Sequence, residues 1–342
     1  MKSIATKNAL GLTICHDITE IIVGEHKKVA FKRGHVVRPE DIPHLLRLGK
    51  EHLFVWSDNQ EGWLHEDEAA RRIAAAISGP GVVSDAPVEG RINLKSSRRG
   101  LAVIDLDLLT EINNVPDVTV ATIHTMREVA EGHLLAGTRV VPLCVPEGAI
   151  EKVEELCVAR PPLITVRPFE NHRIGIVTTG SEVYHGRIKD GFGPILKEKF
   201  AHWGGEIISQ TLAPDDPRET AQAIEKTIDA GATIVAVTGG MSVDPDDKTP
   251  AAIRTVSTEI ITYGAPVYPG AMFMLGYRGD IAIMGLPGCV MYARASIFDL
   301  IAPRILAGLR LSRRDFIHLA HGGLCENCPE CRYPNCVFGK SG

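Results

Sequence analysis

The chain has 342 residues, of which 44% are hydrophobic and 23% are charged, and this composition excludes a largely disordered protein. Its formal net charge of −5 gives no electrostatic reason to expect nucleic acid as a partner. The chain holds 8 cysteines, but a disulfide framework is typical of small secreted domains and not of a chain of this length.

The compartment follows from the same features. The sequence starts without an apolar signal segment, and prolines and glycines interrupt its longest chargeless run, 260–277, so a spanning helix is not expected there. We expect a cytoplasmic protein with reduced thiols, no membrane segment and no nucleic-acid partner.

The first half of the chain predicts two regions. Residues 1–60 predict a small α+β region, with strands at 18–23 and 53–56 and a helix at 42–48 that ends at Gly49. Residues 61–162 predict a β-rich mixed domain. Its expected elements are an alanine-rich helix at 66–77 and strands at 101–104, 118–123 and 139–143. Pro161 and Pro162 mark its end, because neither residue fits inside a helix.

The region 166–309 alternates between strand and helix patterns. The expected strands are 173–178, 206–210, 233–237 and 281–284, and the expected helices are 193–203, 217–230, 251–256 and 290–306. Several of these strands are continuous apolar runs, which is typical of strands buried on both faces. The prediction is an α/β domain with a mostly parallel sheet and helices on both faces, arranged in three layers.

In such a fold the ligand binds at the carboxyl ends of the strands. The loops that follow the expected strands are 178–182, 212–216, 238–250 and 285–288. Adjacent glycines, such as Gly239 and Gly240, let backbone N–H groups approach an anion closely. None of these loops matches the glycine-rich dinucleotide fingerprint or the lysine-containing phosphate loop, which disfavours a Rossmann dehydrogenase and a P-loop nucleotidase.

Acidic residues in these loops divide into two groups. Asp216 before Pro217 fits a helix cap, and Thr249 before Pro250 fits the same role for the next helix. Capping does not explain the remaining acids, which are Asp215, Asp244, Asp246 and Asp247. A divalent cation would offset the repulsion between these carboxylates, and a solvated acidic turn is the alternative.

Five of the chain's motifs resemble, in order, those of the molybdopterin-binding domain that is shared by molybdopterin adenylyltransferases and molybdopterin molybdotransferases. They are Thr179-Gly180-Ser181-Glu182, Asp190 before Gly193-Pro194, Pro214-Asp215-Asp216, the Thr238–Pro250 loop, and Leu286-Pro287-Gly288. The resemblance covers about 170–308. Tyr268-Pro269-Gly270 and Gly285-Leu286-Pro287-Gly288 resemble the molybdotransferase branch in particular.

The resemblance implies the last step of molybdenum cofactor assembly, in which adenylylated molybdopterin and molybdate react with Mg²⁺ to give the metal cofactor and AMP. It implies catalytic roles for Asp247, Asp190 and Asp215, and metal binding by Asp247 and Asp244. The residues implied to bind the pterin substrate are Thr179, Gly180, Ser181, Glu182, Gly239, Gly240, Ser242, Pro269, Gly270, Leu286, Pro287 and Gly288. Its implied partners are a second copy of the chain, a molybdopterin adenylyltransferase or a recipient molybdoenzyme.

Two alternatives stay open at this point. The 238–250 loop also resembles the adenylyltransferase branch, which implies ATP-dependent adenylylation of molybdopterin. A non-catalytic pterin carrier or redox sensor is the second alternative, because the Met-Asp-Gly-Tyr-Ala run of the molybdotransferase branch is absent and extra cysteines are present.

A cysteine-rich tail, 310–342, follows the resembling region. Cys325, Cys328, Cys331 and Cys336 form a C-x2-C-x2-C-x4-C series. Four thiolates at this spacing favour a metal site, either zinc or an iron–sulfur cluster, although the bacterial ferredoxin run has three residues before its last cysteine and a proline after it. A flexible, thiol-rich tail is the alternative. The scattered Cys289, at an expected helix start, is expected to be a small buried cysteine in preference to a reactive thiol.

Overall fold

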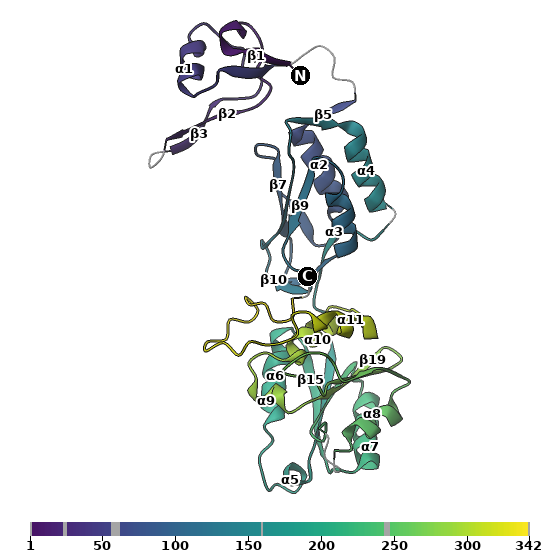
Figure 1. Ribbon diagram of the computed structural model, residues 1–342. Helices are drawn as coiled ribbons and strands as arrows, with labels where there is room; N and C mark the ends of the chain where they lie inside the picture. The colour runs from purple at the N-terminus through teal and green to yellow at the C-terminus, as the bar shows by residue number, and fades with distance from the viewer. Residues whose placement is uncertain (1, 23–25, 56–61, 159, 243–246, 341–342) are drawn as a thin grey trace. The chain divides into compact units, whose positions relative to one another are not determined.

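The computed structural model describes residues 2–22, 26–55, 62–158, 160–242 and 247–340. The chain forms two compact units (Figure 1). The first comprises Met1–Ser97, Ile104–Ile123 and Glu131–Thr165, and the second comprises Arg98–Val103, His124–Ala130 and Val166–Gly342. No helix in the described residues is long and apolar enough to cross a membrane.

The first unit begins with short strands and one helix, as the sequence predicts. Strand β1 (Lys2–Ala5) pairs with β4 (His52–Val55), β2 (Ile18–Ile22) pairs with β3 (His26–Phe31), and α1 is Asp41–Arg47. A short 3-10 turn, η1 (Thr6–Asn8), follows β1. The small core of this region includes the buried side chains of Ile14, Ile18, Leu45 and Leu53.

The rest of the first unit is a sheet covered by helices. The four-stranded sheet has the order β6-β7-β11-β9, and a separate pair joins β12 to β5. The strands of this part of the unit are β5 (Trp63–His65), β6 (Val82–Ser84), β7 (Arg91–Ser96), β9 (Val118–Thr122), β11 (Leu134–Val140) and β12 (Cys144–Pro146). Its helices are α2 (Glu66–Ile77), α3 (Leu106–Asn113) and α4 (Glu147–Val158).

Two expectations for this region are wrong. The strand expected at 139–143 is β11, which ends at Val140, because Arg139 and Val140 pair with the start of β9 and the chain then turns. Two helices, α3 and α4, are missing from the prediction. Asp105 starts α3 by accepting a hydrogen bond from the backbone N–H of Leu108 at 2.9 Å, which is the usual N-cap arrangement.

The second unit contains a six-stranded, mostly parallel sheet in the order β15-β14-β16-β19-β18-β17. The strands are β14 (Arg173–Thr179), β15 (Glu206–Ala213), β16 (Ile234–Thr238), β17 (Glu259–Tyr263), β18 (Met274–Arg278) and β19 (Ile281–Leu286). Strands β15, β14, β16 and β19 are parallel, whereas β18 and β17 are antiparallel. The chargeless run 260–277 therefore forms most of strands β17 and β18, at one side of the sheet. A small sheet of β8 (Gly100–Ile104), β10 (Arg127–Val129) and β13 (Ile164–Arg167) completes the strand list.

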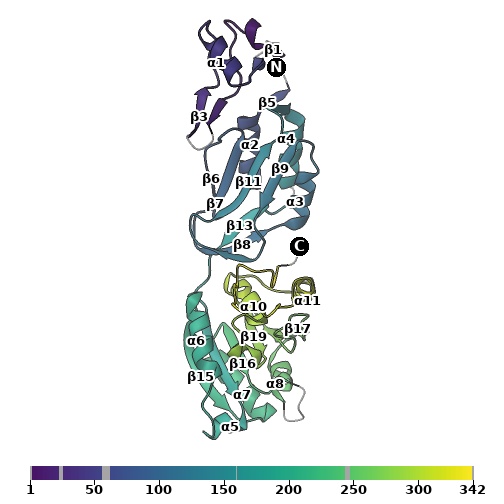
Figure 2. The ribbon, with the colours of Figure 1, turned by 60° about the vertical axis from the view of Figure 1, so that its left-hand side comes forward.

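Helices cover both faces of the six-stranded sheet, as the three-layer prediction requires (Figures 1 and 2). Helices α6 (Phe192–His202) and α10 (Ile297–Leu306) pack on one core, and α7 (Pro217–Asp229) and α8 (Thr249–Val256) pack on the other. The α/β fold class is confirmed. The sheet's buried strands read as apolar runs because both of their faces are covered.

The single helix expected at 290–306 is wrong, because the chain forms two helices there. Helix α9 is Cys289–Tyr292, and α10 starts afresh after Ser296. The Ser296 side chain and the Asp299 carboxylate form a capping box, in which Asp299 accepts from the Ser296 backbone N–H at 2.8 Å. A capping box of this kind defines a helix start and so separates the two helices.

The tail folds onto the second unit. It contains α11 (Arg313–Ile317) and the 3-10 turn η2 (His318–Ala320), and Phe316, Leu319 and Phe338 are buried in the core beside α10. The backbone N–H of Cys325 donates to the carbonyl of Tyr268 at 2.8 Å, and that of Tyr268 donates to the carbonyl of Gly323 at 2.8 Å. The described part of the tail is therefore packed against the second unit at these positions.

We expect the stability of the second unit to fall in mild acid because of His172. Burial lowers the pKa of His172 below its usual 6.5, and its Nδ1 lies 3.1 Å from the hydroxyl of Thr233. The folded state therefore binds fewer protons than the unfolded state as the pH falls through about 6.5, so stability present at neutral pH is lost below it. Urea midpoints at pH 7.5 and 5.5 should differ more for the unaltered protein than for His172→Gln, and equal differences would contradict this assignment.

Candidate functional site

The site is the carboxyl edge of the parallel strands. Strand β14 pairs with β15 up to Thr179 and Ala213, and with β16 up to Thr178 and Thr238. Strand β16 in turn pairs with β19 up to Leu286. All four strands point the same way, so the loops after them emerge at one edge, as the sequence predicts.

The order of the strands reverses between β14 and β16. The chain passes from β14 to β15 on one side, and then returns to place β16 on the other side of β14. A crevice forms at such a reversal, and ligands of α/β sheets bind there. At this point the buried hydroxyls of Thr179 and Thr249 lie 3.0 Å apart and share a hydrogen bond.

We expect this hydroxyl pair to stabilise the crevice by about 1–3 kcal/mol, because replacing one partner leaves the other buried without a hydrogen bond. Thr179→Val should lower the free energy of unfolding by that amount, measured by urea denaturation. Thr178→Val is the matched control, since Thr178 is equally buried but its hydroxyl has no hydrogen-bond partner within the described chain. The control should be neutral or stabilising, and an equal loss in both variants would argue against the pair.

Two glycines bring the backbone of the next loop against β14. Gly239 and Gly240 have φ angles of 85° and 52°, which other residues rarely adopt. A Cβ at Gly239 would overlap the carbonyl oxygen of Thr179, so only glycine fits this close approach. The backbone of the loop is thus held against the end of β14.

The loops after β16 and β19, together with residues 269–272, line an open cleft of about 500 Å³. Of the predicted substrate and catalytic residues, those that line it are Gly239, Gly240, Ser242, Asp247, Pro269, Gly270, Pro287 and Gly288. The lining residues that the sequence reasoning missed are Phe192, Met241, Ala271, Met272, Cys289, Met291 and Tyr292. The only sequence signal for these was their position next to the glycine motifs, because apolar side chains of this kind are also typical of a core.

Other predicted residues lie behind or beside the cleft. Leu286 is fully buried in the core below it. Asp215 accepts a hydrogen bond from the backbone N–H of Ser181 at 2.7 Å and so ties the loop after β15 to the start of α5 (Ser181–Tyr184). Gly180, with φ of 139°, makes the turn before α5, and Glu182 lies within that helix. Thr179, Gly180, Ser181 and Glu182 therefore flank the cleft and do not line it.

Asp190 holds the first turn of α6. Its carboxylate accepts from the backbone N–H groups of Phe192 and Gly193 at 2.9 and 3.0 Å, and from the side-chain amide of Gln210 at 2.5 Å. This arrangement places Phe192 in the cleft wall. Asp190 therefore affects the cleft through the position of Phe192, because its own oxygens accept hydrogen bonds from other residues of the chain.

The two predicted helix caps, Asp216 and Thr249, have different outcomes in the structure. Asp216 caps α7 by accepting from the backbone N–H groups of Glu219 and Arg218, and these bonds lower its pKa. That prediction is confirmed. The same prediction for Thr249 is wrong, because Thr249 is the first residue of α8 and its hydroxyl bonds to Thr179.

The cation expected in the acidic loop has one described ligand candidate. Asp247 is half-buried at the cleft wall, whereas the predicted ligand Asp244, and Asp246, lie outside the described residues. No three His, Cys, Asp or Glu side chains gather around a common point in the described chain. Mg²⁺ is typically held by one or two carboxylates together with substrate phosphates, so Asp247 fits this mode and a complete protein cage is not needed.

Cys289 is a buried residue of the cleft wall, as expected. It is 8% exposed, and burial raises its pKa above the usual value. A thiol with a raised pKa is mostly protonated near neutral pH and is a poor nucleophile. Cys289 therefore contributes shape to the cleft and no thiolate chemistry.

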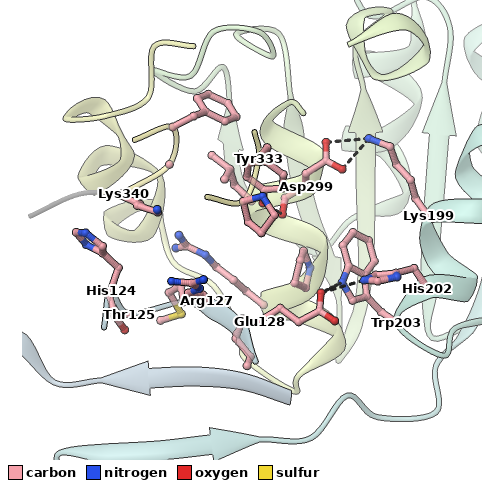
Figure 3. A pocket seen from close by; sticks show the side chains of 18 of the residues that line it. His124, Thr125, Arg127, Glu128, Lys199, His202, Trp203, Asp299, Tyr333 and Lys340 are labelled. Atoms are coloured by element: carbon pink, nitrogen blue, oxygen red, sulfur yellow. Dashed lines mark hydrogen bonds and ion pairs between the residues drawn. The ribbon is translucent and has the colours of Figure 1, made fainter. Parts of the chain in front are cut away.

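A second cavity, of about 370 Å³, lies in the second unit beside α6 and α10 (Figure 3). Lys199 from α6 donates to both oxygens of Asp299 at 2.7 and 2.8 Å, and Asp299 is the capping-box acid in the first turn of α10. The hydroxyl of Tyr333 in the tail donates to the backbone carbonyl of Asp299 at 3.0 Å. Asp299 therefore connects α6 and the tail to α10 in the wall of this cavity.

Comparison with known proteins identifies part of this unit. Residues 175–307 match the family described as "Probable molybdopterin binding domain". The match covers the parallel sheet and its loops but less than half of the chain, so it identifies the domain and not the whole protein. Residues 3–57 match a domain of unknown function (DUF8806).

Individual relatives match shorter stretches. A CinA-like protein of Mycobacterium avium is 32% identical over 77 residues, which are 22% of this chain and 18% of that protein. A molybdopterin molybdenumtransferase of Synechococcus elongatus is 25% identical over 125 residues, which are 34% of this chain and 31% of that protein. The matched part of this chain thus spans less than a third of either curated relative. The structure of the molybdopterin biosynthesis enzyme MoaB from Thermus thermophilus is 24% identical, with a TM-score of 0.36 over 40% of this chain and 98% of that one.

Proposed function

We propose that the protein acts in molybdenum cofactor biosynthesis, where it inserts molybdate into adenylylated molybdopterin and releases AMP. The observation that carries this proposal is the cleft at the carboxyl edge of the parallel strands of the molybdopterin-binding domain, where Gly239, Gly240, Ser242 and Asp247 contribute to the lining. The substrate carries a phosphoanhydride and molybdate is a second anion, so a site for both needs many N–H donors and little side-chain bulk.

Each part of the cleft has a role in this proposal. The backbone of Gly239 and Gly240 donates to the phosphate of the pterin, and the side chain of Ser242 adds a hydroxyl donor. Pro269-Gly270 and Pro287-Gly288 also line the cleft, and their lack of long side chains leaves room for the ring system. Asp215 and Asp190 act as positioning residues, because their oxygens hold the loop at Ser181 and the start of α6.

Asp247 is the proposed catalytic carboxylate. It is the described acid of the cleft wall, and it would hold Mg²⁺ against the phosphoanhydride. The bound ion would polarise that group and offset the charge of the leaving AMP. Asp247 would be the residue of the described chain that holds the ion.

An assay with the full chain tests the proposal. Purified protein supplied with Mg²⁺, molybdate and adenylylated molybdopterin should release AMP, measured by chromatography. The same protein supplied with ATP and molybdopterin tests adenylyl transfer, which would instead consume ATP. Binding of the pterin without turnover in either reaction would contradict the proposed transferase activity and support a carrier. Partnership with a second copy of the chain, an adenylyltransferase or a recipient molybdoenzyme belongs to the same proposal.

A further inference from the structure

The four tail cysteines line a single cavity. It measures about 600 Å³, and Cys325, Cys328, Cys331 and Cys336 all contribute to its wall. None of them is in a disulfide; Cys328 and Cys331 are exposed, while Cys325 and Cys336 are half-buried against the core. The fold therefore presents four free thiols to one partly open cavity.

We propose that this cavity binds an iron–sulfur cluster of the four-iron type through the four cysteines. The spacing of the first three, C-x2-C-x2-C, is that of bacterial cluster ligands, and the fourth follows on the same short segment. Structural zinc sites more often take their cysteines as two separated pairs. The spacing of the first three cysteines thus favours the cluster over the single ion, while four residues, and not three, precede the fourth cysteine.

The arrangement of the four cysteines in the fold also favours a cluster over a single zinc ion. A tetrahedral zinc ion with Zn–S bonds of about 2.3 Å requires its sulfurs within roughly 4 Å of one another. In the described residues no three of these potential ligands are grouped as they would be around a single ion, although all four cysteines line one cavity. A cluster brings its own sulfides and is a larger body, so its thiolate ligands stand farther apart.

The surroundings of the cavity suit a cluster with negative charge. Arg294 and Arg332 lie in its wall and offset thiolate charge, while Glu330 is the carboxylate there. Aromatic side chains complete the wall, namely Tyr268, Tyr292, Tyr333 and Phe338. Of these, Phe338 is buried and Tyr333 is half-buried, so they limit solvent access on the inner side of the cavity, while Tyr268 and Tyr292 are exposed.

The cradle is fixed before any metal binds. Backbone hydrogen bonds hold Cys325 and Gly323 to Tyr268, and Phe338 is buried in the core. Transfer of a preformed cluster from four carrier thiolates breaks four S–Fe bonds to the carrier and forms four to the tail cysteines; the four tail thiols give up their protons to the released thiolates, and no oxidation state changes. Pro269 and Tyr292 line both this cavity and the pterin cleft, which places the cluster next to the proposed substrate site.

Metal analysis of the full chain, purified without oxygen, tests the proposal. We expect about four irons and about four acid-labile sulfides per chain, with broad absorbance near 400 nm that bleaches on reduction. The double variant Cys328→Ser/Cys331→Ser should hold at least about tenfold less iron. Both residues are exposed, so circular dichroism and the urea midpoint should stay near those of the unaltered protein.

Cys144→Ser is the matched control, because Cys144 is a half-buried free cysteine of the first unit, outside the tail. Its iron content should equal that of the unaltered protein. One zinc per chain without sulfide would overturn the proposal in favour of a zinc site. Folded protein with neither metal nor sulfide, even after reconstitution with iron and sulfide, would also overturn it. These readouts do not depend on AMP release, so they stand apart from the proposed transferase activity.

Discussion

Replacing Asp247 by asparagine is expected to lower AMP release by about 100-fold or more, while binding of the pterin substrate stays measurable. The amide keeps the shape of the side chain but removes the negative charge that would hold Mg²⁺ in the cleft. Glycine-loop N–H groups would still bind the phosphate. Steady-state rates and equilibrium binding of adenylylated molybdopterin, measured on the same preparation, separate the two effects.

Asp216→Asn is the control for this change. Asp216 lies on a neighbouring loop of the same edge and caps α7, and asparagine is an equally good helix cap. The control should therefore keep both the rate and the urea midpoint. If Asp247→Asn releases AMP as fast as the unaltered protein, Asp247 has no catalytic role.

Gly239→Ala is expected to destabilise the second unit by more than about 3 kcal/mol and to abolish pterin binding. Two costs add at this position. Alanine is strained at a φ of 85°, and its Cβ would overlap the carbonyl oxygen of Thr179. Relief requires the loop to move away from β14, which removes the N–H donors from the crevice. Urea denaturation measures the stability, and calorimetric titration with the pterin measures the binding.

Gly264→Ala separates the two costs. Gly264 has a φ of 91°, close to that of Gly239, but a Cβ there meets only the carbonyl oxygen of Ala271, at 3.7 Å. This variant should lose about 1–2 kcal/mol, the cost of the backbone conformation alone. The excess loss at Gly239 then reports the close approach to Thr179. Equal losses in the two variants would mean that the loop tolerates a side chain.

The layout of the second unit was predictable because its signals are local and strong. Buried parallel strands such as β14 and β16 are continuous apolar runs, and parallel strands necessarily end at one edge. The positions of the glycine loops followed from this rule. Predicting which loop residues line the cleft was harder, since Phe192 and Met241 have the same apolar character as core residues.

Misses came from signals that compete with one another. Apolar residues continue through 290–306, so their pattern favours one helix, yet the Ser296–Asp299 capping box starts a second one. Thr249 before Pro250 has the pattern of a cap, but a hydroxyl partner 70 residues away takes its side chain. Asp105 is a readable cap for α3, and only the strand-like neighbours 101–104 obscured it. Tertiary contacts of this kind cannot be predicted from the local sequence.

The tail shows the same limit. Its cysteine spacing was readable, but its docking was not, because Tyr333 and Phe338 are isolated aromatic residues in a polar segment. Their burial depends on α10, whose residue Asp299 accepts the Tyr333 hydroxyl. The local sequence therefore left a flexible tail open as the alternative to a metal site, whereas in the fold Tyr333 and Phe338 pack beside α10.

The long separation of the crevice residues has a consequence for how the protein folds. Thr179 and Thr249 meet only after β14 and β16 have paired, and parallel pairing joins segments that lie far apart in the chain. Such contacts close large loops before they yield any stabilisation, so they form late. A partly folded second unit would therefore lack a ligand site even if its helices are in place. Any ligand of the crevice then binds the native state alone, and raises its population according to ligand concentration and affinity.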